Sequence, residues 1–188
     1  MKDRQDPRAV DLPALCRHGL PLQGEWPQAG MPRLAGSVAA AGPDAAPVAW
    51  SARGELRPVA GGEAEVWLHL SAATTVTLQC QRCLQPMAEP LHVDRRLRFV
   101  RGEAEAARLD EASEDDVLDL PPRLDLHELV EDELILALPL VPRHADCPAP
   151  LPLPAAEPEV DAPAPAPHPF AALAALRRRG PGDGSGGH

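Results

Sequence analysis

Residues 63–100 read EAEVWLHLSAATTVTLQCQRCLQPMAEPLHVDRRLRFV, and this stretch decides the fold because apolar and polar residues alternate along most of it. Successive side chains of a β-strand point to opposite faces of a sheet, so alternation is typical of a strand with one buried face. The apolar positions that share a face within their strands are Val66, Leu68, Leu70, Leu91, Val93, Leu97 and Phe99. The pattern predicts strands over residues 63–70, 74–79 and 87–100.

One more strand is expected before this stretch, over residues 48–56. Gly61-Gly62 separates it from the strand at 63–70, as a turn does. Strands that follow one another through short links favour an antiparallel sheet.

The strongest helix signal is DLHELVEDELILAL at 125–138. Asp125 suits the N-terminal cap, Glu128 follows three residues later as in a capping box, and Pro139 ends the helix. Short helices are also expected over residues 12–18 and from about Pro32. We therefore predict an α+β fold: an antiparallel sheet of four or more strands with the 125–138 helix packed on it.

Composition divides the chain into a domain and a tail. Residues 1–147 are predicted to form one domain, within which 102–119 is expected to be an acidic loop. Residues 148–169 hold nine prolines and are predicted to be an extended linker. A short helix is expected at 170–179, followed by a flexible tail at 180–188.

The net charge of −10 is unevenly distributed. Residues 1–101 carry 12 basic and 10 acidic residues, whereas residues 102–133 carry 2 basic and 13 acidic ones. Sequence-independent binding of nucleic acid needs a basic surface, which the chain as a whole does not offer, and a smaller basic face in the first half is the alternative that stays open. The start of the chain resembles no signal peptide, and no apolar run reaches the length of a membrane span, so a cytoplasmic location without a membrane partner is expected.

The sharpest local motif is CQRC at 80–83, placed between two predicted strands where a hairpin turn belongs. Two cysteines separated by two residues suit a zinc ion. His144 and Cys147 have the same spacing, so Cys80, Cys83, His144 and Cys147 are the candidate ligands of a tetrahedral site.

Two other interpretations of these cysteines stay open. They fit reduced thiols with a purely structural role, and they fit a redox pair, since Arg82 beside them favours a thiolate. A thioredoxin-type pair opens a helix after a strand, however, and here strand patterns flank the motif. Cys16 lies apart and is expected in the core.

Arginines gather around the last predicted strand and its preceding turn. Arg82, Arg95, Arg96 and Arg98 form a hypothetical phosphate-binding surface, although alternation places Arg95 on the face opposite Arg96 and Arg98. Solvent-facing arginine on an edge strand is the ordinary alternative.

The outer side of the 125–138 helix offers a second candidate surface. Glu128, Glu131 and Asp132 are expected to face outward, where they would contact a protein partner. Enzyme templates are missing from the sequence: it has neither a glycine-rich phosphate loop, nor a nucleophile elbow, nor HExxH. We therefore expect a protein that is not an enzyme and has no small-molecule substrate.

Several motifs together resemble the YceD family of large ribosomal RNA subunit accumulation proteins. The resemblance is carried by CQRCLQPM at 80–87 and by DLHELVEDELILALPLVPRH at 125–144 with Cys147 beyond it. It extends to VDLPALCRHGLPLQGEW at 10–26, MPRL at 31–34 and HPFAALAALRR at 168–178, where His168 replaces an asparagine.

The resemblance implies a role in the synthesis, processing or stability of 23S ribosomal RNA, through ribosomal RNA or ribosome-assembly proteins as partners. It implies binding rather than catalysis. Two alternatives remain: a zinc-stabilised protein-interaction module without RNA contact, and a CxxC thiol oxidoreductase.

Overall fold

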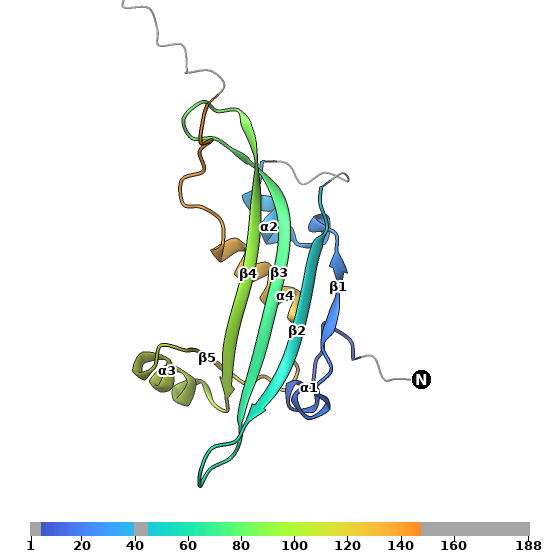
Figure 1. Ribbon diagram of the computed structural model, residues 1–188, viewed down its shortest axis with the longest axis vertical. Helices are drawn as coiled ribbons and strands as arrows, with labels where there is room; N and C mark the ends of the chain where they lie inside the picture. Colours follow the sequence, from blue (N-terminus) through green and yellow to red (C-terminus); the bar gives the residue numbers. More distant parts are fainter. Residues whose placement is uncertain (1–4, 40–44, 148–188) are drawn as a thin grey trace, which may run out of the picture. The chain divides into compact units, whose positions relative to one another are not determined.

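The computed structural model describes residues 5–39 and 45–147 (Figure 1). In these ranges the elements are, in chain order, α1 (Leu12–His18), β1 (Leu22–Trp26), the 3-10 helix η1 (Gln28–Gly30), α2 (Pro32–Ser37), β2 (Val48–Arg57), β3 (Glu65–Gln79), β4 (Pro86–Val100), α3 (Glu103–Ala112), β5 (Asp116–Asp119) and α4 (Leu126–Leu136). The linker, helix and tail predicted over 148–169, 170–179 and 180–188 lie outside the described residues.

The strands form one sheet in the order β1-β2-β3-β4-β5. The first three pairings are antiparallel, and only the short β5 runs parallel to its neighbour β4. The predicted α+β class and the antiparallel sheet of four or more strands are confirmed, with one parallel edge strand added.

The strands predicted over 63–70 and 74–79 are a single strand, β3. The small residues between them, Ser71, Ala72 and Ala73, weaken a strand pattern. They continue the alternation nevertheless, because Ala72 is buried and pairs with Trp50 on one side and Val93 on the other. Pairing on both sides holds the segment extended.

The loop predicted over 102–119 is wrong, since this segment forms α3 and β5. Helix α3 reads EAEAARLDEA, made of strong helix formers, and an Arg108–Glu105 ion pair of 2.7 Å links neighbouring turns. Only Ala106 of the helix is buried, so the apolar stripe that would have signalled a helix is missing.

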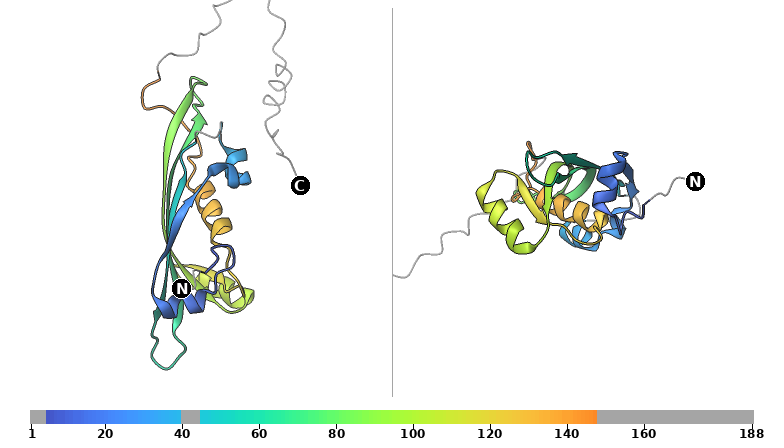
Figure 2. Two further views of the ribbon diagram at one scale, coloured as in Figure 1. Left: turned by 90° about the vertical axis from the view of Figure 1, so that its right-hand side faces the viewer. Right: turned by 90° about the horizontal axis from the view of Figure 1, so that it is seen from below.

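All the helices lie on one side of the sheet (Figure 2). The inward positions of β2, β3 and β4 meet residues of α1, α2 and α4 in a single core. The largest fully buried side chains include Leu12, Met31, Leu34, Leu68, Leu70, Leu97, Leu126 and Leu134. The opposite face of the sheet carries no helix within the described ranges.

The α4 helix follows its sequence signals closely. The Asp125 carboxylate accepts hydrogen bonds from the backbone amides of His127 at 2.8 Å and Glu128 at 3.1 Å, which caps the first turn. The helix ends at Leu136, close to the predicted end.

At the far end of the sheet, α1 packs against β2 where a glycine leaves room. A Cβ atom at Gly54 would lie 2.8 Å from the backbone nitrogen and Sγ of Cys16. Cys16 is buried there, as expected, and its thiol lies 3.6 Å from the carbonyl oxygen of Trp67. None of the helices in the described ranges combines the length and apolarity needed to cross a membrane.

Candidate metal centre

The hairpin between β3 and β4 places two cysteines on one tight turn. The Leu84 amide donates to the Cys80 carbonyl and the Cys80 amide donates to the Gln85 carbonyl, both at 2.9 Å. Leu84 has a φ of 60°, a left-handed conformation that favours glycine. This turn orients the side chains of Cys80 and Cys83 toward the same point.

The chain after α4 returns to this turn and brings the second pair of ligands. Pro139 cannot continue the helix, and the following segment runs alongside the hairpin (Figure 1). The Gln81 amide donates to the carbonyl of Pro142 at 2.9 Å, which fixes the returning segment against the turn. His144 and Cys147 then reach the two buried cysteines.

The four ligand atoms have the spacing of a tetrahedral zinc site. The sulfur atoms of Cys80 and Cys147 are 3.7 Å apart, and the Cys83 sulfur lies 3.4 Å from Nδ1 of His144. All four atoms lie within 4.8 Å of one another. Zn–S bonds of about 2.3 Å in a tetrahedron place neighbouring ligand atoms about 3.6–3.8 Å apart. The predicted ligands therefore come together in a group that fits zinc.

The surroundings favour thiolate at Cys80, the form that binds a metal. Burial opposes ionisation most strongly, but hydrogen bonds from the backbone amides of His144, Arg82 and Cys83 outweigh it and lower the pKa of Cys80 to about 5. At Cys83 the Gln85 amide favours the thiolate, whereas burial and the adjacent thiols prevail and raise the pKa. A metal binds cysteine as thiolate, so Cys80 is prepared for binding, whereas Cys83 must lose its proton when a metal binds.

Arg82 belongs to this centre in the structure. Its Nε donates to the sulfur of Cys147 at 2.9 Å, and its Nη2 donates to the carbonyl oxygen of His144 at 3.5 Å. A site of three thiolates and one imidazole around Zn²⁺ carries a net negative charge, which the guanidinium offsets. The predicted grouping of Arg82 with the strand arginines is therefore not found.

The remaining arginines divide between the two faces of the sheet. Arg95 lies on the helix side, where its guanidinium pairs with Glu133 at 3.0 Å and Asp116 at 3.7 Å. Arg96 and Arg98 lie on the face without helices, as alternation predicts. The four arginines of the predicted phosphate surface therefore do not form one surface. Arg82 lies at the candidate metal centre, Arg95 on the helix side of the sheet, and Arg96 and Arg98 on the opposite face.

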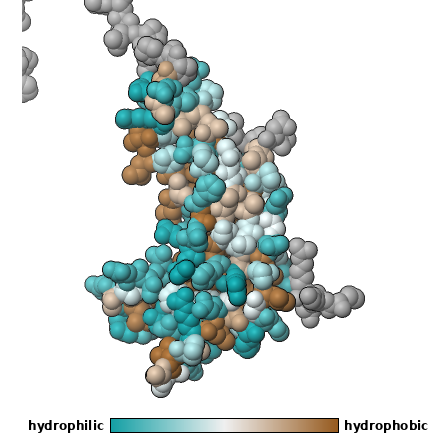
Figure 3. Space-filling model, viewed as in Figure 1, coloured by the Kyte–Doolittle hydropathy of each residue, from teal (hydrophilic) through white to brown (hydrophobic). Residues whose placement is uncertain are grey.

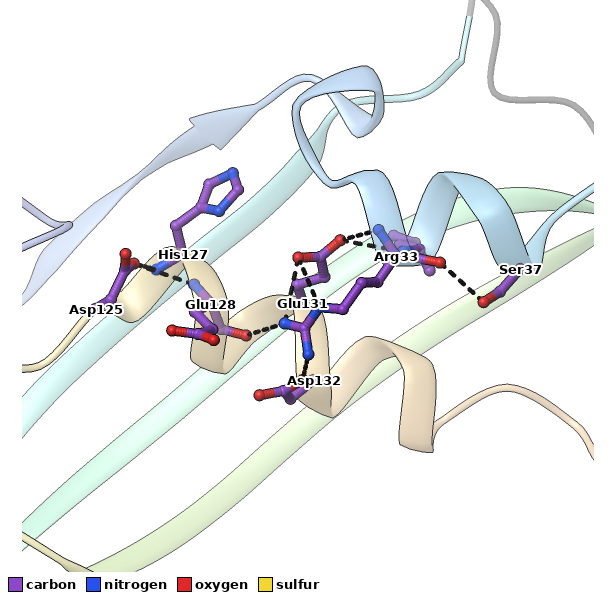
Figure 4. A network of polar contacts seen from close by, with 8 residues as sticks. Arg33, Ser37, Asp125, His127, Glu128, Glu131 and Asp132 are labelled. Atoms are coloured by element: carbon purple, nitrogen blue, oxygen red, sulfur yellow. Dashed lines mark hydrogen bonds and ion pairs between the residues drawn. The ribbon is translucent and has the colours of Figure 1, made fainter.

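The outward orientation expected of Glu131 is wrong. Glu128 is exposed and Asp132 half-buried, but the Glu131 side chain is 4% exposed and accepts hydrogen bonds from the backbone amides of Arg33 at 2.7 Å and Leu34 at 3.1 Å (Figure 4). The N-terminus of α2 needs acceptors there, and Glu131 supplies them. The Arg33 guanidinium also pairs with Glu131 and Asp132.

Sequence reasoning missed the polar residues that β2 contributes. Arg53, Glu55 and Arg57 alternate with inward residues and lie on the same face as His69 and Arg96. The alternation of strand 48–56 would have placed them there, but the register that joins them to β3 and β4 is not visible in one sequence.

Comparisons with known proteins agree with the arrangement of the motifs. Residues 68–177 match the model of a family described as large ribosomal RNA subunit accumulation protein YceD. The chain is 41% identical over 70 residues to the Haemophilus influenzae (strain ATCC 51907 / DSM 11121 / KW20 / Rd) protein named large ribosomal RNA subunit accumulation protein YceD. That alignment covers 37% of this chain and 40% of the relative. No solved structure matches the chain.

Proposed function

The chain belongs to the YceD family of large ribosomal RNA subunit accumulation proteins, and from this premise we propose that it is an accessory factor for the synthesis, processing or stability of 23S ribosomal RNA. The observation that carries the proposal is the family match over residues 68–177, which includes all four candidate metal ligands. The protein acts by binding in the cytoplasm, with ribosomal RNA or ribosome-assembly proteins as partners, and it is not an enzyme.

Zinc has a structural role in this proposal. Three thiolates and one imidazole fill all four positions of a tetrahedral ion, so none is left for a reactive water. The ion joins the β3–β4 hairpin to the segment after α4 and thereby orders the end of the sheet.

Metal content is the direct test of this centre. Purification without chelator is expected to give one zinc per chain by mass spectrometry, and the Cys80→Ser, Cys83→Ser variant is expected to lose it. Cys16→Ala is the matched control, since Cys16 lies outside the ligand group. Wild-type protein without metal would overturn the zinc centre.

The cellular role is tested by depletion. Cells that lack the protein are expected to have a lower ratio of 23S to 16S ribosomal RNA, and wild-type protein should restore it. An unchanged ratio would contradict the proposed function even if the metal centre is present.

A zinc-stabilised protein-interaction module is the second candidate. Exposed apolar side chains support it at and near the hairpin: Leu84 on the turn, and Leu140 and Val141 beside Pro142, whose carbonyl binds Gln81. Glu128 and Asp132 are the proposed polar contacts on α4. A protein partner captured by pull-down after nuclease treatment would favour this candidate.

A thiol oxidoreductase is the third candidate, and the low pKa of Cys80 supports it. Zinc and redox turnover compete for the same thiolate. Alkylation that stays slow until a chelator is added would show that the metal holds the thiolate, whereas rapid alkylation of zinc-loaded protein would favour redox chemistry.

A further inference from the structure

One face of the sheet is free of helices in the described part of the chain and forms a broad surface (Figures 1 and 2). In Figure 3, which shows this face, the middle region mixes pale, tan and teal residues, whereas the lower region is dominated by hydrophilic residues. On this face the small residues Ala49, Ser51, Ser71 and Ala73 help to line a shallow hollow of about 440 Å³. The hydrophilic end is where the charged residues of β2, β3 and β4 meet.

The register aligns three basic side chains in one row across this face. Arg53 of β2 pairs with His69 of β3, and His69 pairs with Arg96 of β4. Because neighbouring strands are about 4.8 Å apart, Arg53 and Arg96 are separated by about 10 Å at their backbones. We call Arg53, His69 and Arg96 the basic row.

Of the carboxylates next to the row on this face, Glu55 and Glu65 are paired, whereas Asp94, two positions before Arg96 on β4, forms no ion pair with a described residue. Glu55 pairs with Arg57 at 3.1 Å and lies 3.5 Å from His69, while Glu65 pairs with Arg98 at 2.8 Å and also accepts from Nε1 of Trp67 at 2.9 Å. Arg53 and Arg96 are exposed and form no ion pair with any residue in 5–39 or 45–147. Their guanidinium groups are therefore available to a ligand.

Trp67 lies on this face itself, paired with Glu55 and Arg98 in the strand register, and is covered by other side chains. The Arg57 guanidinium carbon lies 3.9 Å from the centre of its ring, and the Trp67 side chain is only 3% exposed. A covered ring offers no platform for stacking bases. Within the described residues this end of the face thus presents exposed guanidinium groups and no exposed aromatic ring, which suits contact with a charged backbone rather than with bases.

We propose that the basic row binds the sugar-phosphate backbone of RNA, with Arg53 and Arg96 each contacting a phosphate. This inference rests on the proposed function and identifies the surface that serves it. Asp94 lies on the same face immediately beside Arg96, and Glu25 lies further along on β1, so phosphates are confined to the row. His69 lies between the two arginines with its Nε2 atom buried beside Glu55, so the phosphate contacts are assigned to the two arginines alone.

The same face is poorly suited to a protein partner. Protein interfaces depend on large apolar anchors, and none of the exposed large hydrophobic residues in the described ranges projects from this face of β2, β3 or β4. Small residues, hydroxyl groups and unpaired arginines match the polar and positively charged character of nucleic-acid interfaces.

The test uses the full-length protein and a fluorescein-labelled 20-nucleotide single-stranded RNA, titrated at several salt concentrations. The Arg53→Gln, Arg96→Gln variant is expected to bind at least about tenfold more weakly at low salt. Its plot of log affinity against log salt should be shallower by about 1.4, the effect of losing two phosphate contacts on a single strand. Both residues are exposed, so circular dichroism of the variant should match the wild type.

The matched control is Arg108→Gln, Arg123→Gln, which removes the same charge from exposed positions outside this face. It should keep the wild-type affinity and salt slope. If the two double variants lose binding equally, the basic row is overturned as a specific site.

The outcomes separate this inference from the proposed function. Wild-type binding that the Arg53→Gln, Arg96→Gln variant retains would overturn the basic row, while a lowered 23S ratio in depleted cells would still support the function. Loss of binding in that variant with an unchanged ratio in depleted cells would support the site and overturn the function. Arginine-dependent binding of polyglutamate without binding of the RNA would replace the RNA ligand with an acidic protein.

Discussion

At the scale of single residues, Glu131 joins two helices that are about a hundred positions apart in the sequence. Its carboxylate accepts from the backbone amides of Arg33 and Leu34 and pairs with the Arg33 side chain (Figure 4). Leu34 is fully buried, so its amide finds no water if this acceptor is lost. The carboxylate therefore couples the start of α2 to the middle of α4.

Glu131→Ala should lower the free energy of unfolding by about 2–4 kcal/mol, because two amides lose their acceptor. Asp132→Ala is the matched control: it removes a half-exposed carboxylate from the same arginine and should cost less than about 1 kcal/mol. Urea denaturation measures both. Equal losses in the two variants would contradict a special role for Glu131.

His127 makes stability depend on pH. Its ring is buried and meets the edge of Trp26 with 4.8 Å between ring centres, and burial, assisted by Arg8, lowers its pKa below the ordinary 6.5. The unfolded chain then binds a proton near pH 6.5 that the folded chain does not. The contribution of His127 to the free energy of unfolding is therefore fully present above pH 6.5, and it decreases as the pH falls toward the lowered pKa of the folded state.

His127→Gln should therefore lose less stability than the wild type between pH 7.5 and pH 5.5. Urea denaturation at the two pH values gives the comparison, with the other titrating groups common to both proteins. An identical loss in the variant would show that His127 makes no contribution in this interval.

The residues of the metal centre could be selected from the sequence, whereas their surroundings could not. Cys80, Cys83, His144 and Cys147 form two pairs with the same spacing of two intervening residues. This spacing can be recognised as a metal-binding signature in the sequence alone. The role of Arg82 depends on where the segment after α4 returns, and the burial of Glu131 depends on α2. Both depend on tertiary contacts, which the local pattern of residues in the sequence does not reveal.

At the scale of secondary-structure elements, hydrophobic periodicity predicted the helices and strands that bury a large apolar face. It did not predict the elements whose buried face is small. β2, β4 and α4 were predicted because their apolar residues alternate or recur at helical spacing. α3 buries one alanine, and β5 buries only Val117, so neither has a periodic signal. Their polar composition resembles a loop, and packing against the edge of the sheet orders them.

The contact between α1 and β2 depends on a missing side chain. Gly54→Ala would place a Cβ atom within 3 Å of the backbone of Cys16, so α1 must move or the strand must bend. We expect a loss of about 1–3 kcal/mol in the free energy of unfolding, as is typical of overpacking.

Gly36→Ala is the control for this substitution. Gly36 lies in α2, and a Cβ atom added there would meet no neighbouring atom within 4 Å, so alanine should be neutral or stabilise by up to about 1 kcal/mol. Chemical denaturation of both variants separates the packing effect at Gly54 from the general effect of replacing a glycine. Equal stability of Gly54→Ala and wild type would show that α1 shifts at little cost.

At the scale of the whole molecule, the two faces of the sheet have separate tasks. One is covered by α1, α2 and α4 and supplies the core, while the other carries no helix in the described residues and presents the proposed basic row. The metal centre lies at the end of the β3–β4 hairpin and the row lies near the opposite end of those strands. Loss of zinc and loss of the row arginines should therefore be separable.

Removal of zinc should lower the thermal unfolding midpoint and leave the sheet folded. An ion that binds only the folded chain stabilises it by about 2.7 kcal/mol at a free concentration of one hundred times its Kd. The midpoint should increase with added zinc in the wild type and stay constant in Cys80→Ser, Cys83→Ser. If the thermal unfolding midpoint of the wild type changes with neither added zinc nor added chelator, the ion does not contribute to stability.

The distance along the chain between the two ligand pairs has a further consequence. A zinc ion bound at the proposed centre would convert the 63 residues between Cys83 and Cys147 into a closed ring that contains β4, α3, β5 and α4. Closing a ring of this size restricts the unfolded chain by an amount worth about 4 kcal/mol in a disulfide. The proposed ion would therefore act as a removable cross-link that chelators open and reductants leave intact, and it would connect the strand that carries Arg96 to the helix that holds Glu131.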